Sequence, residues 1–173
     1  MHETTQDIEW LQALLDRSYA GAGEHLRSIT TPARRIPAIE LPDLLTGVQI
    51  IDLATVTADG RPMVAPVDGL FFRSRFYFSS SKSSVRYRHL MARPTVSAAH
   101  TRGEELAVVV HGTANLFALD EPEHAAFRDY CVEIYLPLYG EDWRKFAESP
   151  DIFFGRIDPA LMFTFRLGQP ALP

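Results

Sequence analysis

The chain has 173 residues, and one domain of this length buries enough apolar surface to fold without a disulfide or a metal ion. Its net charge of −5 argues against general nucleic-acid binding, and no apolar run reaches the ~18 residues of a membrane span. The single cysteine, Cys131, and the absence of a leader pattern in the first residues predict a cytoplasmic protein.

The first part of the chain predicts a helical arm. Apolar residues at positions 8, 11, 14 and 15 have helical spacing, and glycines at 21 and 23 interrupt the helix. Residues 30–47 contain three prolines and favour an extended connector. We therefore expect an arm and connector over residues 1–45, a main domain over 46–168 and a tail over 169–173.

The rest of the chain predicts six strands. Asp59-Gly60 is a strong hairpin signal after the first strand, and Pro94 ends a helix. Six mostly antiparallel strands favour a closed or partly closed barrel, because closure leaves few exposed edges. The expected fold is α+β: a six-stranded antiparallel barrel with an N-terminal helical arm. Strands are expected at 50–57, 61–68, 70–79, 95–100, 105–119 and 152–167, the last bent at Asp158-Pro159, and helices at 82–92 and 121–136.

The segment between Asp68 and Glu104 has an unusual charge pattern. It contains no acidic residue, and its centre reads as a strand, a serine-rich turn and a helix start. A helix N-terminus offers free backbone N–H groups and about half a positive charge, so the segment predicts a phosphate site. A solvated basic helix face is the alternative. The segment holds seven basic residues: Arg73, Arg75, Lys82, Arg86, Arg88, Arg93 and Arg102.

A helical projection of residues 82–93 separates two faces. Lys82, Arg86, His89 and Arg93 share one face, which we expect to meet the anion. Another face contains an aromatic residue and two apolar residues, which we expect to pack on the barrel: Tyr87, Leu90 and Met91.

Several motifs, in this order, are similar to those of the pyridoxamine 5'-phosphate oxidase-like split-barrel flavoproteins. The resemblance extends over about residues 46–168. The motifs are Asp59-Gly60-Arg61-Pro62, Ala65-Pro66-Val67, Phe76-Tyr77-Phe78-Ser79, Val85-Arg86-Tyr87-Arg88-His89-Leu90, Pro94-Thr95-Val96-Ser97, His111-Gly112-Thr113-Ala114-Asn115-Leu116 and the closing segment 153–165.

The resemblance implies a homodimer that binds FMN at each subunit interface and acts as an oxidoreductase on an unidentified small molecule. Hydride transfer would run through the flavin N5, so no catalytic side chain is assigned. The backbone of four residues would lie along the isoalloxazine ring: Val64, Ala65, Pro66 and Val67. Five side chains would hold the phosphate: Ser79, Ser80, Ser84, Arg86 and Arg88.

The vitamin-producing oxidases of this group carry an arginine in the second strand, a lysine shortly after it and an Arg-x-His ending. This chain has Ala65, then Asp68-Gly69-Leu70, and no histidine near its end. We therefore expect a family member that is not a pyridoxamine phosphate oxidase. Two alternatives are a deazaflavin-dependent reductase and a non-catalytic flavin or haem carrier. The histidines lack metal-ligand spacing, so no metal site is predicted.

Overall fold

The computed structural model describes residues 2–167, so the predicted tail over 169–173 lies outside the described residues. Strands and helices follow one another in the order that the sequence predicts. The strands are β1 (Gln49–Val56), β2 (Pro62–Phe72), β3 (Arg75–Ser81), β4 (Thr95–Arg102), β5 (Leu106–Phe117) and β6 (Ile152–Arg166). The helices are α1 (Thr5–Ala20), α2 (Glu24–Ile29), α3 (Leu41–Leu44), α4 (Val85–Ala92), α5 (Ala125–Tyr139) and α6 (Glu141–Ala147), with short 3-10 turns at Pro32–Arg34, Ala38–Glu40 and Pro122–His124.

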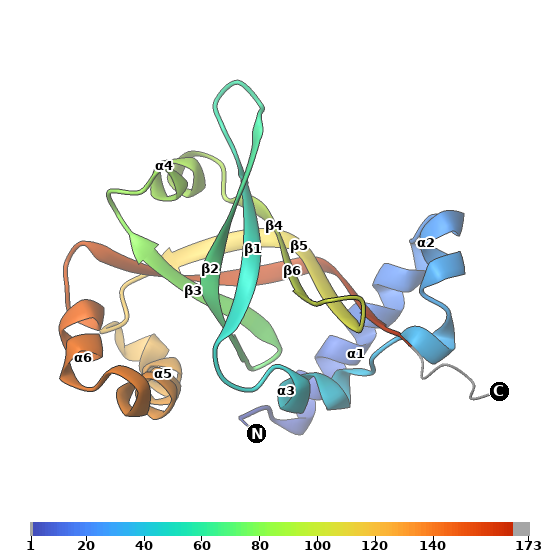
Figure 1. The fold of residues 1–173 in the computed structure, drawn as a ribbon, viewed down its shortest axis with the longest axis horizontal. Helices are drawn as coiled ribbons and strands as arrows, with labels where there is room; N and C mark the ends of the chain where they lie inside the picture. Colours follow the sequence, from blue (N-terminus) through green and yellow to red (C-terminus); the bar gives the residue numbers. More distant parts are fainter. Residues whose placement is uncertain (1, 168–173) are drawn as a thin grey trace.

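The six strands form a closed barrel in the order β1-β2-β3-β6-β5-β4, and all neighbours are antiparallel (Figure 1). This confirms the predicted α+β barrel. The β5–β6 pairing shifts register where Gly112 pairs with Pro159 and His111 pairs with Leu161. The extra residue forms a bulge that bends β6, as the Asp158-Pro159 pair predicted.

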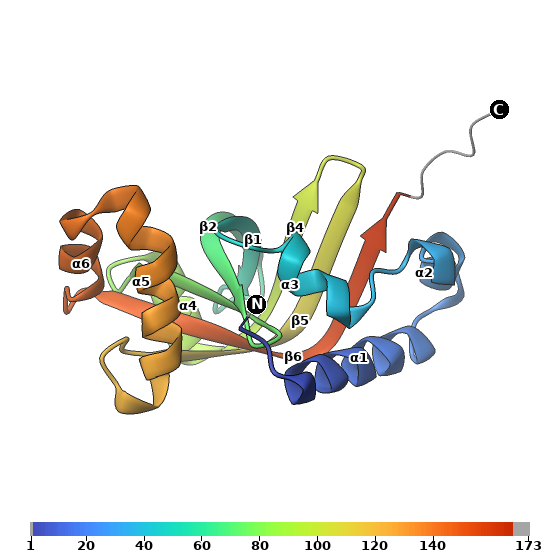
Figure 2. The same ribbon diagram turned by 90° about the horizontal axis from the view of Figure 1, so that it is seen from below.

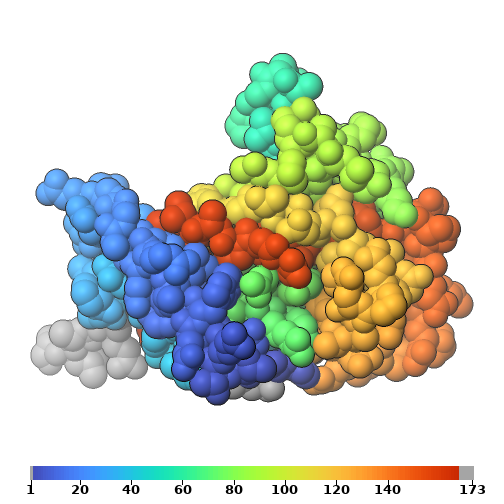
Figure 3. All heavy atoms as spheres, turned by 180° about the vertical axis from the view of Figure 1, so that it is seen from behind, coloured from blue at the N-terminus to red at the C-terminus, as the bar shows by residue number. Residues whose placement is uncertain are grey.

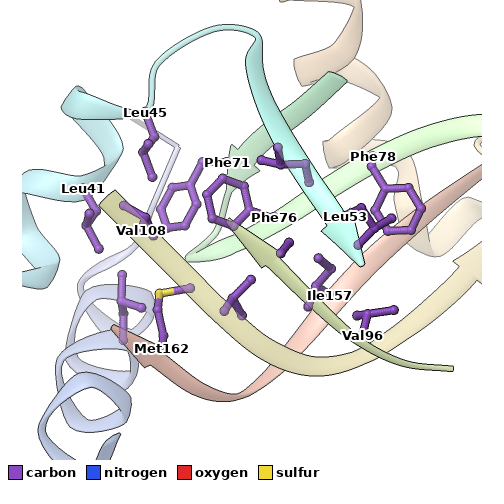
Figure 4. Packing of buried hydrophobic residues seen from close by; sticks show 14 of the residues in the cluster. Leu41, Leu45, Leu53, Phe71, Phe76, Phe78, Val96, Val108, Ile157 and Met162 are labelled. Atoms are coloured by element: carbon purple, nitrogen blue, oxygen red, sulfur yellow. The ribbon is translucent and has the colours of Figure 1, made fainter. Parts of the chain in front are cut away.

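The barrel core continues into the N-terminal arm. Figure 4 shows Leu41 and Leu45 on the same side of the core as Phe71, next to the side chains that fill the barrel. Alternate residues of each strand point inward, so aromatic and branched side chains from all six strands meet there. The arm and the barrel therefore share one hydrophobic core.

Hydrogen bonds also hold α1 on β6, and the two run side by side in Figure 2. The buried Tyr19 hydroxyl donates to the Thr164 carbonyl oxygen at 2.6 Å and accepts from the Thr164 N–H at 2.8 Å. The Ser18 hydroxyl accepts from the Met162 N–H at 3.0 Å. These bonds satisfy backbone groups of β6 that would otherwise be buried without partners.

A second apolar cluster lies between the outer face of the barrel and α5. Tyr77 of β3 stacks on Phe127 of α5, with ring centroids 4.0 Å apart, and Phe72 stacks on Tyr130. The helices α5 and α6 therefore cover the outer face of the barrel on one side, and the arm lies on the other side of the molecule (Figures 1 and 3). No helix of residues 2–167 is long and apolar enough to cross a membrane.

Candidate anion-binding site

The barrel opens where β2 and β3 diverge. These strands pair only from Gly69–Phe72 to Arg75–Phe78, and residues 62–68 of β2 pair with β1 alone. The β1–β2 hairpin therefore projects beyond the barrel, beside α4 (Figure 1). One edge of β2, including Val64–Val67, is left without a strand partner, so its backbone groups other than the missing N–H of Pro66 can bond to side chains or a ligand.

Arg86 bridges the gap between the two diverging strands. Its guanidinium donates to the Ser80 hydroxyl of β3 at 3.1 Å and to the Pro66 carbonyl of β2 at 3.5 Å. Burial lowers the pKa of Arg86 from its ordinary value, but a guanidinium stays charged in proteins. Among residues 2–167, no carboxylate forms an ion pair with it. A half-buried cation with only neutral partners favours the binding of an anion.

The start of α4 lies beside this guanidinium. The Ser84 hydroxyl accepts from the Tyr87 N–H at 3.1 Å, so Ser84 is the N-cap and the helix begins at Val85. The Ser84 hydroxyl proton is still available to donate to a ligand. The turn before it is closed by the Ser84 N–H, which donates to the Ser81 carbonyl at 3.0 Å. The Ser84 hydroxyl, the first N–H groups of α4 and the Arg86 guanidinium thus lie beside the same cavity, and this combination suits a phosphate.

A cavity of about 200 Å³ lies between the hairpin and α4. Its wall is largely apolar, and the hairpin side chains beside it are exposed to solvent, Met63 by 47% and Val64 by 67%. The residues around the cavity include Thr55, Val64, Ala65, Ser84, Arg86 and His89. The opening therefore combines an anion site with an apolar surface.

The structure brings together most of the predicted site residues but not all of them. Ser79 points to the opposite side of β3 from Ser80, into a second cavity of about 250 Å³. The exposed Arg88 lies two residues after Arg86, about 200° further around the helix. Val67 is buried, opposite Ile51 of β1. The residues that do gather at the opening are Val64, Ala65, Pro66, Ser80, Ser84 and Arg86, and the binding roles of all nine stay predictions.

The predicted cationic face of the helix was partly wrong. Lys82 precedes the helix, because Ser84 caps it, and its ammonium donates to the Pro150 carbonyl at 2.6 Å. His89 is buried, with a ring nitrogen 3.0 Å from the Thr55 hydroxyl. Arg93 donates to the Val56 carbonyl at 3.0 Å, so Arg86 and His89 are the residues of that face that line the cavity.

The predicted packing face was also partly wrong. Leu90 is buried, but Met91 is 63% exposed. The helix lies across the open end of the barrel, so His89, not Met91, faces inward over β1. No sequence pattern indicated the Thr55–His89 contact, because the two residues are 34 positions apart and only the closed fold brings them together.

Other basic residues of the segment have structural roles. Arg75 forms an ion pair with Asp158 at 3.2 Å and lies over the Trp10 ring at 4.2 Å. Arg102 donates to the Gln49 side chain at 3.2 Å. These residues hold strands and arm together and do not reach the opening, so the anion site depends on a smaller part of the segment than the charge pattern suggested.

A six-stranded antiparallel barrel that opens beside a capped helix is the split-barrel class of fold. The sequence profile of the family described as Pyridoxamine 5'-phosphate oxidase matches residues 39–163. The chain therefore belongs to this family, as the motifs predicted. No curated protein matches the chain in sequence.

Solved structures confirm the fold. A conserved hypothetical protein from Mycobacterium tuberculosis has a TM-score of 0.66 at 18% identity, covering 82% of this chain and 92% of its own. A haem storage protein from Vibrio cholerae has a TM-score of 0.61 at 19% identity, covering 74% and 92%. An FAD-binding protein from Mesorhizobium loti has a TM-score of 0.58 at 24% identity, covering 78% and 98%. At these identities the likeness establishes the fold alone.

Proposed function

We propose that the protein is an FMN-binding oxidoreductase that transfers a hydride to or from a small molecule. The observation that carries the proposal is the Arg86 guanidinium, half-buried at the opening of the barrel with neutral partners only. Family membership supports a flavin, as does the similarity to proteins described as FAD-binding and as an F420 reductase.

Each part of the site has a role in this proposal. Arg86, Ser80, Ser84 and the N-terminus of α4 hold the phosphate by charge-assisted hydrogen bonds. The free edge of β2 at 64–67 presents N–H and C=O groups to the polar edge of the ring system, and the exposed Val64 packs against its face. The bound flavin supplies hydride transfer at N5, while the protein provides binding and orientation.

A homodimer completes the site in this proposal. The hairpin projects from the barrel with Met63 and Val64 exposed, and Val85 is exposed at the start of α4. Large apolar side chains clustered on a projecting element are typical of an interaction surface. A second copy of the chain that packs here covers these side chains and closes the ring site.

Titration of the purified protein with FMN, followed by quenching of flavin fluorescence, tests the proposal. Replacement of Arg86 in Arg86→Gln removes hydrogen bonds to a charged group, which contribute about 1.5–3 kcal/mol each. We expect affinity to fall by at least about tenfold. Arg17→Gln, at an exposed position of α1, is the matched control and leaves affinity unchanged. A protein that fails to bind FMN contradicts the proposal.

The absorption spectrum of the same protein distinguishes the alternatives. A flavin, a deazaflavin and a haem have different visible absorption bands. A deazaflavin band would identify a deazaflavin as the cofactor in place of FMN, and a sharp Soret band would identify a haem. A haem is the second candidate, because one structural neighbour is a haem storage protein. Loss of the flavin absorption when an oxidisable substrate is added would show that the bound flavin accepts electrons, which distinguishes an enzyme from a carrier.

A further inference from the structure

A larger cavity, of about 600 Å³, lies among α5, α6 and the adjoining ends of β3 and β6. It shares no lining residue with the cavity beside Arg86. Its volume is within the range of about 300–1,000 Å³ that is usual for small-molecule sites. Apolar side chains form much of its wall: Leu119, Val132, Trp143 and Ile152.

Of the charged residues that line this cavity, Arg128 of α5 is the least exposed. Arg128 is half-buried, and its guanidinium has no hydrogen bond or ion pair with any residue of 2–167. Lys82, which is exposed, also lines the cavity, and its contact with the Pro150 carbonyl occupies one of its three ammonium protons. The cavity therefore offers free donors on cations beside an apolar wall.

The remaining charges lie at the rim. Asp120 and Glu148 are exposed, so solvent screens them. Arg144 is exposed as well and pairs with Glu141 at 3.2 Å. Two rim carboxylates oppose a dianion such as a phosphate more strongly than a monoanion, whereas one half-buried guanidinium matches a single negative charge.

We propose that this cavity binds a small amphipathic carboxylate, at a site separate from that of the flavin. The carboxylate lies on Arg128, which can bind it with two parallel hydrogen bonds, and Lys82 lies within the same wall. The hydrocarbon part packs against Leu119, Val132 and Trp143. Burial of the hydrocarbon removes apolar surface from water and so favours binding, and recognition therefore needs both halves of the ligand.

Trp143 provides a direct reporter for the test. The chain has two tryptophans, so the Trp10→Phe variant leaves Trp143 as its only one. Octanoate, octylammonium and octan-1-ol, which have the same chain length, are titrated into the complete protein while Trp143 fluorescence is followed. We expect a saturable change with octanoate and none with octylammonium. All three probes are compared on the Trp10→Phe variant, and the difference between octanoate and octylammonium shows whether the cavity recognises a negative or a positive charge.

Variants at position 128 complete the test. Arg128→Gln weakens octanoate binding by at least about tenfold, as expected for the loss of a charge-assisted pair. Arg27→Gln, at an exposed position of α2, is the control and leaves binding unchanged. Arg128→Glu reverses the preference towards octylammonium, and circular dichroism checks that each variant is folded. Equal responses to the three probes, or octanoate binding that survives Arg128→Gln, overturns the proposal.

Discussion

Arg86 and Arg88 are chemically identical and two residues apart, yet their surroundings differ. Arg86 contacts Ser80 and Pro66 in the gap, whereas Arg88 is exposed on another side of α4. An exposed charge contributes about 0.2–1 kcal/mol to an interaction, so Arg88→Gln should weaken FMN binding by less than about fivefold. Arg86→Gln should weaken FMN binding by at least about tenfold.

Fluorescence titrations at low and high salt check this difference. The effect of Arg88→Gln should largely vanish at high salt, because exposed charges are screened. The effect of Arg86→Gln should persist. Equal losses for the two variants would mean that the phosphate contacts both arginines, as the sequence motif alone predicted.

Gly112 marks a position where the backbone leaves no room for a side chain. A Cβ there would lie 2.2 Å from the carbonyl oxygen of Asp158, which is backbone and cannot move without distorting the bulge. Overpacking of this kind costs about 1–3 kcal/mol, so Gly112→Ala should lower the free energy of unfolding by at least that amount. Urea denaturation followed by circular dichroism measures it.

The control for this prediction is Gly23→Ala. No atom lies within 4 Å of a Cβ built at Gly23, and its φ of −67° suits any residue. Gly23 is the N-cap of α2, where alanine is less favourable than glycine, so the loss of stability should stay within about 1 kcal/mol. An undiminished stability of Gly112→Ala would show that β5 and β6 can slide past each other at the bulge.

At the scale of elements, local patterns predicted the strands well and the helix α4 less well. Asp59-Gly60 and Pro94 are local signals, and the strand pairs and helix end that they predicted are present. The start of α4 depends on which of several serines caps it, and all of them are suitable caps. Arg86 contacts residues of two other elements, β2 and β3, so these contacts could not be derived from helical spacing.

The docking of α1 on β6 depends on Tyr19. In Tyr19→Phe the buried N–H of Thr164 loses its acceptor, and an unsatisfied buried donor costs about 1–3 kcal/mol. We expect the free energy of unfolding to fall by that amount. Tyr139→Phe is the matched control, because Tyr139 is exposed and its hydroxyl has no hydrogen bond to a residue of 2–167. Equal stabilities of the two variants would contradict a role for the hydroxyl in docking.

At the scale of the molecule, the sequence predicted a closed or partly closed α+β barrel, but not which strands pair to close it. Closure requires β1 to meet β4 at Asp52–Ala54 and β3 to meet β6, and these pairs are remote in sequence. The divergence of β2 from β3 is equally non-local, and it creates the opening. The candidate site was therefore predictable as a list of residues but not as a geometry.

The exposed hairpin leads to a prediction about assembly. If a second copy covers Val64, then Val64→Glu places a charge in an apolar interface, where an unpaired carboxylate is strongly unfavourable. Light scattering coupled to gel filtration should give twice the chain mass of 19.5 kDa for the unaltered protein and a single chain for the variant.

Ile29→Glu is the control, because Ile29 is an exposed apolar residue of α2 in the arm, and it should leave the dimer intact. FMN affinity should fall together with dimerisation in Val64→Glu, since the ring site then lacks its second wall. A monomeric unaltered protein that binds FMN tightly would instead mean that the hairpin and α4 form the whole flavin site within one chain. The exposed Met63 and Val64 would then contact the cofactor and not a second copy of the chain.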